Sequence, residues 1–242
     1  MILEPAYALF SGGKDSFATA HVLADVGMLL GCVSLETGIS TPDWKTSVQA
    51  ICSERDWPLH FFKTSDSYDR IVLKYGFPGP AQHGQTMNYL KGRAVRRFKK
   101  AFPGAILASG VRHDESARRS LSTKQESYFE GVKVIAPLFD WSTEAVWEYV
   151  RSKGYVRPQA YSTLQISGDC LCGAFARSDE RAAIRYWYPE IDQRLTRLEN
   201  QLNNGIAGDL THAVGHLWGW GCNREQKKTG KLKLICVECG TA

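Results

Sequence analysis

Short apolar runs alternate with longer amphipathic runs along the first two thirds of the chain. The apolar runs predict five strands, over 6–10, 31–35, 59–62, 105–109 and 133–138. Amphipathic runs predict helices over 17–30, from Thr41 onward, over 87–100 and over 143–153. Because strands that alternate with helices favour crossover connections, the pattern predicts an α/β domain with a parallel five-stranded sheet and helices on both faces.

Capping residues predict where several helices begin and end. Thr41 is a typical N-cap residue and Pro42 follows it at the first helical position. Ser142 is expected to cap the helix over 143–153, which Gly154 ends.

The strand pattern stops near residue 160. Ser178 predicts the N-cap of a helix, and Pro189 separates that helix from a second one that runs to Asn203. We therefore predict an α/β domain over residues 1–160 and a C-terminal helical lobe with a cysteine cluster over residues 161–242.

The turn between the first strand and the first helix combines two glycines with polar side chains. Its sequence is Ser11-Gly12-Gly13-Lys14-Asp15-Ser16, and we call it the phosphate loop. Backbone N–H groups and the helix dipole favour an anion at such a turn, and Lys14 adds a full positive charge. The Asp15 carboxylate would repel a phosphate unless a metal ion lay between them, so the loop indicates a nucleotide bound with Mg²⁺. A glycine turn without a ligand is the alternative.

The phosphate loop lacks the spacing of a Walker A loop, and instead it resembles the PP-loop of the ATP pyrophosphatases. The resemblance implies a fold of the adenine nucleotide alpha hydrolase-like kind. It also implies that the loop holds the β- and γ-phosphates of ATP while the reaction occurs at the α-phosphate.

Later segments resemble the phosphoadenosine phosphosulfate reductases, a family with this loop. Thr37-Gly38, with Pro42 four residues later, is similar to the stretch that lines the adenosine pocket there. The segment from Gly110 to Arg119 resembles the family's G-x-R-x-x-E-S-x-x-R motif, which implies that Arg112 and Arg119 neutralise charge on the phosphates. A surface arginine cluster is the alternative.

Lys91 lies in the basic helix predicted over 87–100. The positive charges of this helix indicate a rim that attracts polyanions. In the reductases that the chain resembles, a helix near this position with a Leu-Lys pair like Leu90-Lys91 contacts the substrate. A solvated helix face, with Val95 and Phe98 turned inward, is the alternative.

Four cysteines near the C-terminal end have the spacing of metal ligands. Cys170-x-Cys172 and Cys236-x-x-Cys239 would supply four thiolates from two separate turns, as zinc or a 4Fe-4S cluster requires. Unligated thiols are the alternative. Cys32 and Cys52 fall within a predicted strand and helix, where we expect core positions.

Length and composition restrict the class of protein. The 242 residues suffice for one α/β domain and a smaller lobe, and a net charge of +5 suits an anionic substrate. No apolar run is long enough for a membrane span and the N-terminus has no signal-peptide pattern, so we expect a cytoplasmic protein. The oligomeric state stays open.

These patterns together predict an enzyme that cleaves ATP at the α-phosphate, giving pyrophosphate and either AMP or an adenylylated acceptor. One alternative is a phosphoadenosine phosphosulfate or adenosine phosphosulfate reductase with Cys239 as its nucleophile. Another is a nucleic-acid-associated module that retains an ATP site. The resemblance also implies a partner by analogy, either nucleic acid or a protein complex of sulfur modification or defence.

Overall fold

A computed structural model of the chain describes residues 4–64, 67–113, 124–204 and 215–222. The sheet has six strands in the order β3-β2-β1-β4-β6-β5. The strands are β1 Ala6–Leu9, β2 Leu29–Glu36, β3 Leu59–Lys63, β4 Leu107–Ala108, β5 Glu126–Phe129 and β6 Val132–Ile135. Neighbours from β3 to β6 are parallel, which confirms the five predicted parallel strands.

The sixth strand, β5, was not predicted. It pairs antiparallel with β6 at the edge of the sheet. Glu130 and Gly131 join the two strands with φ angles of 53° and 71°, the backbone of a tight hairpin turn. The Glu-Gly pair between the two strands was the local sequence signal for this turn.

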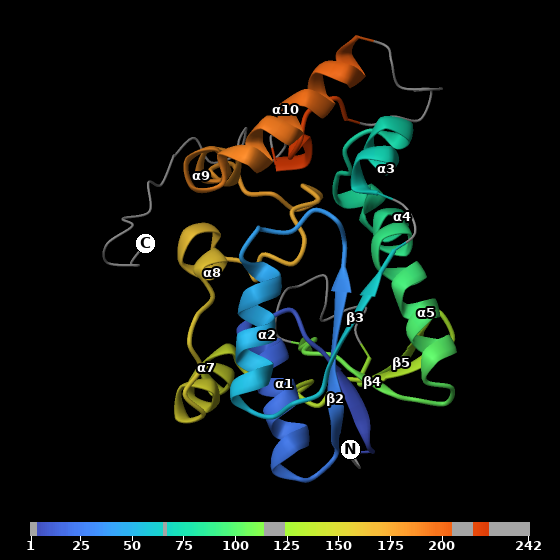
Figure 1. Cartoon of the computed structure of the whole chain (residues 1–242), viewed down its shortest axis with the longest axis vertical. Coiled ribbons are helices and arrows are strands. Elements are labelled where there is room, and N and C mark those ends of the chain that lie inside the picture. Colours follow the sequence, from blue (N-terminus) through green and yellow to red (C-terminus); the bar gives the residue numbers. More distant parts are fainter. Residues whose placement is uncertain (1–3, 65–66, 114–123, 205–214, 223–242) are drawn as a thin grey trace.

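Helices follow and flank the strands (Figure 1). They are α1 Lys14–Asp25, α2 Trp44–Glu54, α3 Tyr68–Tyr75, α4 His83–Met87, α5 Arg93–Ala101, α7 Thr143–Ser152, α8 Gln159–Leu164, α9 Glu180–Trp187 and α10 Pro189–Asn203. Short 3₁₀ turns cover Pro80–Gln82 and Trp220–Cys222. Within the described residues, no helix has the length and apolar character needed to cross a lipid bilayer.

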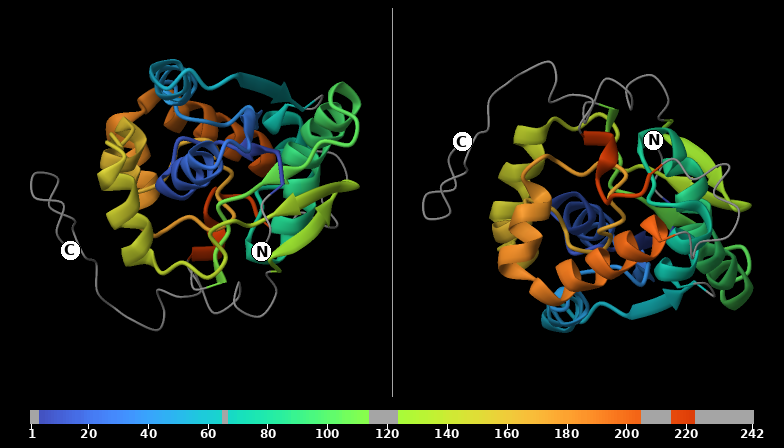
Figure 2. Two further views of the ribbon diagram at one scale, coloured as in Figure 1. Left: turned by 90° about the horizontal axis from the view of Figure 1, so that it is seen from below. Right: turned by 90° about the horizontal axis from the view of Figure 1, so that it is seen from above.

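The two faces of the sheet are covered by different helices, as predicted. Ala6 and Ala8 of β1 pack in one core cluster with residues of α1, α2 and α7. Tyr7 and Leu9 point the other way, toward a second cluster that includes Phe98 of α5. Seen from below, α1 and α7 lie on one side of the strands and α5 on the other (Figure 2).

Three predicted helix starts differ from the structure. The first helix begins at Lys14, directly in the phosphate loop, and ends at Asp25 because Gly27 turns the chain at φ 69°. The second begins at Trp44 after Asp43, and the hydroxyl of Thr41 is buried without a hydrogen-bond partner. Asp179, one residue after Ser178, precedes α9.

Other helix boundaries agree with the sequence. Ser142 caps α7 by accepting a hydrogen bond from the Ala145 backbone N–H, and α10 runs from Pro189 to Asn203. The basic helix predicted over 87–100 lies within a longer helical stretch that a π-helical turn, Asn88–Gly92, interrupts. Such turns insert an extra residue and redirect side chains.

A helical lobe lies beyond the upper end of the sheet (Figure 1). Its core joins residues of α9 and α10 with Tyr68, Ile71 and Val72 of α3, so it draws on both sides of the predicted boundary at residue 160. Cys32 and Cys52 are buried in the core of the α/β domain, as predicted.

Candidate nucleotide site

A cavity of about 400 Å³ opens at the carboxyl ends of β1, β2 and β4. Ligands bind at this edge in parallel sheets. One part of its wall is apolar, formed by Leu9, Phe10, Val33, Leu35, Val95 and Phe129. The remaining wall includes polar groups, among them Ser11, Asp15 and Ser16 of the phosphate loop. An apolar wall beside a few convergent polar groups is typical of sites for small organic ligands.

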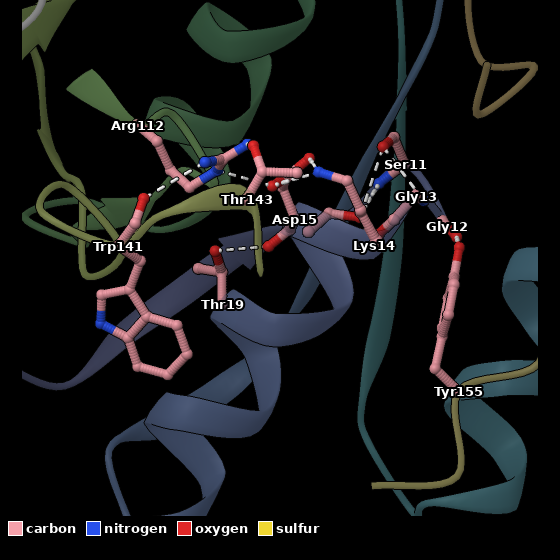
Figure 3. A network of polar contacts seen from close by, with 11 residues as sticks. Ser11, Gly12, Gly13, Lys14, Asp15, Thr19, Arg112, Trp141, Thr143 and Tyr155 are labelled. Atoms are coloured by element: carbon pink, nitrogen blue, oxygen red, sulfur yellow. Dashed lines mark hydrogen bonds and ion pairs between the residues drawn. The ribbon is translucent and has the colours of Figure 1, made fainter. Parts of the chain in front are cut away.

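The phosphate loop is tied to its surroundings through its own carbonyl groups (Figure 3). The Ser16 hydroxyl donates to the Gly13 carbonyl at 2.8 Å, and the Tyr155 hydroxyl donates to the Gly12 carbonyl at 2.9 Å. Trp44 Nε1 donates to the Ser11 carbonyl at 2.9 Å. Gly12 has φ 83°, a backbone conformation that favours glycine.

Gly13 is the N-cap residue of α1 and has no side chain to cap the helix. The first N–H groups of a helix have no intrahelical partners, and a capping side chain commonly satisfies one of them. Without that cap, the start of α1 offers its N–H groups and its positive dipole end to an anion.

Asp15 is held by two cations. Lys14 Nζ contacts its two carboxylate oxygens at 2.7 and 2.8 Å, and Arg112 Nε donates to Oδ1 at 2.9 Å. Arg112 is only 1% exposed, and its other nitrogens donate to the Trp141 carbonyl at 3.2 Å and the Thr143 hydroxyl at 3.1 Å (Figure 3). Arg112 is therefore buried and orients Asp15, and its predicted role in neutralising phosphate charge stays a prediction.

Gly110 brings the end of β4 against the start of α1. A Cβ atom on this glycine would lie 2.7 Å from the Asp15 carbonyl carbon and 2.8 Å from its oxygen. The position therefore requires glycine because of this close approach, and Gly110 lines the cavity as well.

An ion pair that the sequence did not reveal closes another side of the cavity. Lys91 Nζ contacts Asp169 Oδ2 at 2.9 Å, and the Ser167 hydroxyl donates to Oδ1 of the same carboxylate at 2.5 Å. Burial opposes ionisation of Asp169, but the Lys91 ammonium and the Ser167 hydroxyl outweigh it and lower the pKa. The same ion pair raises the pKa of Lys91.

Thr37 and Gly38 lie behind this ion pair and do not line the cavity. The buried Thr37 hydroxyl donates to the Asp169 carbonyl at 2.8 Å, and the Gly38 carbonyl accepts from Arg194 Nη1 at 2.8 Å. Their predicted role in binding adenosine stays a prediction, and Arg119 lies outside the described residues.

Two of the four predicted metal ligands lie together beside a second cavity. Cys170 and Cys172 line this cavity of about 340 Å³ and are hydrogen-bonded to each other. The hydrogen bond from Cys170 lowers the pKa of Cys172 to about 7, and it raises that of Cys170. Cys236 and Cys239 lie outside the described residues. In the part of the chain that the structure describes, no three His, Cys, Asp or Glu side chains form a metal-binding group.

Comparison with known proteins adds a family match. Residues 5–161 match the model of the phosphoadenosine phosphosulfate reductase domain. An uncharacterized protein of Methanocaldococcus jannaschii is 24% identical over 155 residues, which are 62% of this chain and 32% of that protein. The chain thus spans about a third of that relative's length.

Solved structures of similar architecture share few residues with the chain. A phosphoadenylyl-sulfate reductase from Candida auris, in a phosphate complex, has a TM-score of 0.48 and 16% identity over 64% of this chain and 75% of that one. A Candida glabrata FMN adenylyltransferase has a TM-score of 0.47 and 12% identity over 66% and 52%. Likeness at this level concerns the arrangement of strands and helices, not ligands or reactions.

Proposed function

Because the chain belongs to the phosphoadenosine phosphosulfate reductase domain family, we propose that it binds ATP in the cavity beside the phosphate loop and cleaves it between the α- and β-phosphates. The observation that carries this proposal is the meeting of an apolar wall with an uncapped helix start in one cavity. The adenine base would lie against the apolar wall, and the phosphates would face the start of α1.

The phosphate loop provides the groups that the reaction needs. Lys14 and the first N–H groups of α1 would bind the β- and γ-phosphates, which leave as pyrophosphate. Water or another acceptor attacks the α-phosphorus, and the bond from that phosphorus to the bridging oxygen breaks. Positive groups fixed before the reaction stabilise the charge that develops on the leaving group.

The donor set beside the loop fits Mg²⁺. This ion prefers carboxylate and phosphate oxygens, keeps several waters and binds through one or two protein carboxylates. Asp15 lines the cavity, its side chain is 27% exposed, and Arg112 fixes its orientation. Asp15 would hold the ion, which neutralises phosphate charge when bound.

The test is incubation of the full chain with ATP and Mg²⁺, followed by separation of the nucleotides. We expect AMP and pyrophosphate, or pyrophosphate and an adenylylated acceptor. ADP with inorganic phosphate would contradict the proposal, since the loop would then direct attack at the γ-phosphate. Unchanged ATP in the presence of candidate acceptors, with no binding by calorimetry, would also contradict it.

Lys14→Ala tests the loop itself. We expect turnover to fall by on the order of 10²-fold, the effect of losing one transition-state stabiliser. Lys45→Ala is the control for loss of a paired lysine, since Lys45 pairs with the Glu36 carboxylate at 2.9 Å and lies outside the phosphate loop. Equal loss of turnover in both variants would show that the effect is not specific to the loop.

A further inference from the structure

We propose that Cys170 and Cys172 form a redox-active pair, that a small peroxide converts this pair to a disulfide, and that the disulfide weakens nucleotide binding in the neighbouring cavity. The chemistry of the two thiols does not depend on the proposed function. The effect on nucleotide binding does rest on it.

The two thiols share a cavity that small molecules can enter. Both residues are partly exposed and both line the cavity of about 340 Å³, and the two thiols lie close enough for each to shift the pKa of the other. Peroxides and low-molecular-weight thiols are small enough for this space. Accessible paired thiols are the kind that oxidise reversibly.

The backbone between the cysteines directs both side chains to the same side. Leu171 is 1% exposed in the core of the helical lobe, and its two neighbours pack against the same core and also line the cavity. The Leu171 N–H donates to the Ile39 carbonyl at 2.7 Å, and its own carbonyl accepts from Trp218 Nε1 at 2.8 Å. Cys170 and Cys172 thus share one cavity, as residues two apart do in an extended segment.

The spacing makes a disulfide possible but strained. Residues two apart in an extended segment have Cα atoms about 6.6 Å apart. Disulfides tolerate Cα separations up to about 6.8 Å, so the bond would form near the limit of the range, with a small movement of the backbone. Strained disulfides are the more easily reduced kind, which suits a reversible switch rather than a structural crosslink.

The oxidation balances with the peroxide as the electron acceptor. One sulfur attacks a peroxide oxygen, the O–O bond breaks, and a sulfenic acid forms as the first water leaves. The second sulfur then attacks the sulfenic sulfur and the S–S bond forms, with the sulfenic oxygen leaving as a second water. Two thiol protons and two electrons are transferred in all, and a small dithiol reverses the change.

The residue before the pair connects it to the nucleotide cavity. Asp169 precedes Cys170, and its carboxylate holds Lys91 and Ser167, which line both cavities. Its carbonyl accepts from the buried Thr37. A movement of the Cys170 backbone therefore shifts the carboxylate that positions Lys91, a cation facing the nucleotide cavity.

A second pair of cysteines provides an internal comparison. Cys32 and Cys52 are also hydrogen-bonded to each other, but they are 0% and 1% exposed in the core of the α/β domain. The hydrogen bond that the Cys32 thiol donates to Cys52 raises the pKa of Cys32, and burial raises it further. Because both thiols are buried in this core, we expect them to resist the oxidant that converts Cys170 and Cys172.

The experiment treats the full chain, first reduced and then freed of reductant, with hydrogen peroxide. Peptide mapping by mass spectrometry identifies the disulfide, and calorimetry with α,β-methylene ATP measures the Kd before and after oxidation. We expect a Cys170–Cys172 disulfide, a Kd raised about 5-fold or more, and recovery with dithiothreitol. Cys172→Ser should abolish the change, and Cys52→Ala should keep it.

Four results would overturn all or part of the proposal. Stoichiometric zinc or iron in the purified protein would show that the two thiols are metal ligands. Disulfides that join either cysteine to Cys236 or Cys239 would show a different pairing, and a Cys236→Ser/Cys239→Ser variant would then lose them. A mapped Cys170–Cys172 disulfide with unchanged Kd would overturn the coupling between the disulfide and nucleotide binding. If the protein binds no α,β-methylene ATP in either redox state, the proposed function is overturned as well.

Discussion

Arg112→Lys separates two roles for the buried arginine. The sequence motif predicts direct contact with phosphate, whereas the structure places the guanidinium beneath Asp15 at 1% exposure. Lysine keeps the positive charge but has one nitrogen instead of a planar fork. If Arg112 acts by orienting Asp15 and joining β4 to α7, the substitution should reduce stability and activity together.

The hydrogen bonds of Arg112 set the size of the effect. The guanidinium donates in three directions, to Asp15 at 2.9 Å, to the Trp141 carbonyl at 3.2 Å and to the Thr143 hydroxyl at 3.1 Å. Lysine can keep one of these. Hydrogen bonds to charged groups contribute about 1.5–3 kcal/mol each, so losing two should cost about 3 kcal/mol or more. For a chain of this length that lowers the Tm by about 6 °C or more.

The assay is thermal and urea unfolding, together with ATP turnover measured well below the Tm. Thr143→Val is the matched control, because it removes one acceptor of Arg112 and leaves the charge in place. We expect it to cost about half as much as Arg112→Lys. An Arg112→Lys protein with unchanged Tm and turnover reduced on the order of 10²-fold would refute this reasoning and favour direct phosphate contact.

Two further predictions concern the surroundings of the phosphate loop. Gly110→Ala should lower the free energy of unfolding by about 1–3 kcal/mol and reduce ATP turnover, because the new methyl group would overlap the Asp15 backbone. Gly84→Ala is the control: open space surrounds this glycine, so urea unfolding should show an unchanged or higher stability. Burial and Arg55 lower the pKa of His21 to about 4 from 6.5, so folding favours neutral imidazole, and stability should fall as the pH drops from 6.5 toward 4. His21→Gln should flatten that fall in Tm, and an unchanged pH profile would contradict the assignment.

The sheet was predictable because burial and local geometry agree along the chain. Each parallel strand is an apolar run, since both faces of such a strand are covered. The edge strand β5 escaped prediction because its side chains, Glu126 and Ser127 among them, are largely exposed and carry no apolar pattern. Thr41 failed as an N-cap because tertiary packing buries its hydroxyl, which outweighs its capping preference.

The phosphate loop was recognisable because all its residues are contiguous. Asp169 and Ser167 were not, since they join the site only when the loop after α8 folds back against the π-helical turn. The depth of Arg112 was also hidden from the sequence. A motif records that an arginine is required, but not whether its guanidinium faces the ligand or a neighbouring carboxylate.

The ionic pairs around the nucleotide cavity determine how an anion can bind there. Lys14, Arg112 and Lys91 are three cations, and Asp15 and Asp169 are two carboxylates, so the group carries one net positive charge with every member paired. Under the proposed function, a phosphate that binds Lys14 would compete with Asp15 for the ammonium, and Asp15 would keep Arg112 and gain a metal ion. Because Arg112 is buried, it would hold Asp15 in place during this exchange. The two adjacent residues of the loop would therefore take different roles, Lys14 as the phosphate-binding cation and Asp15 as the fixed carboxylate.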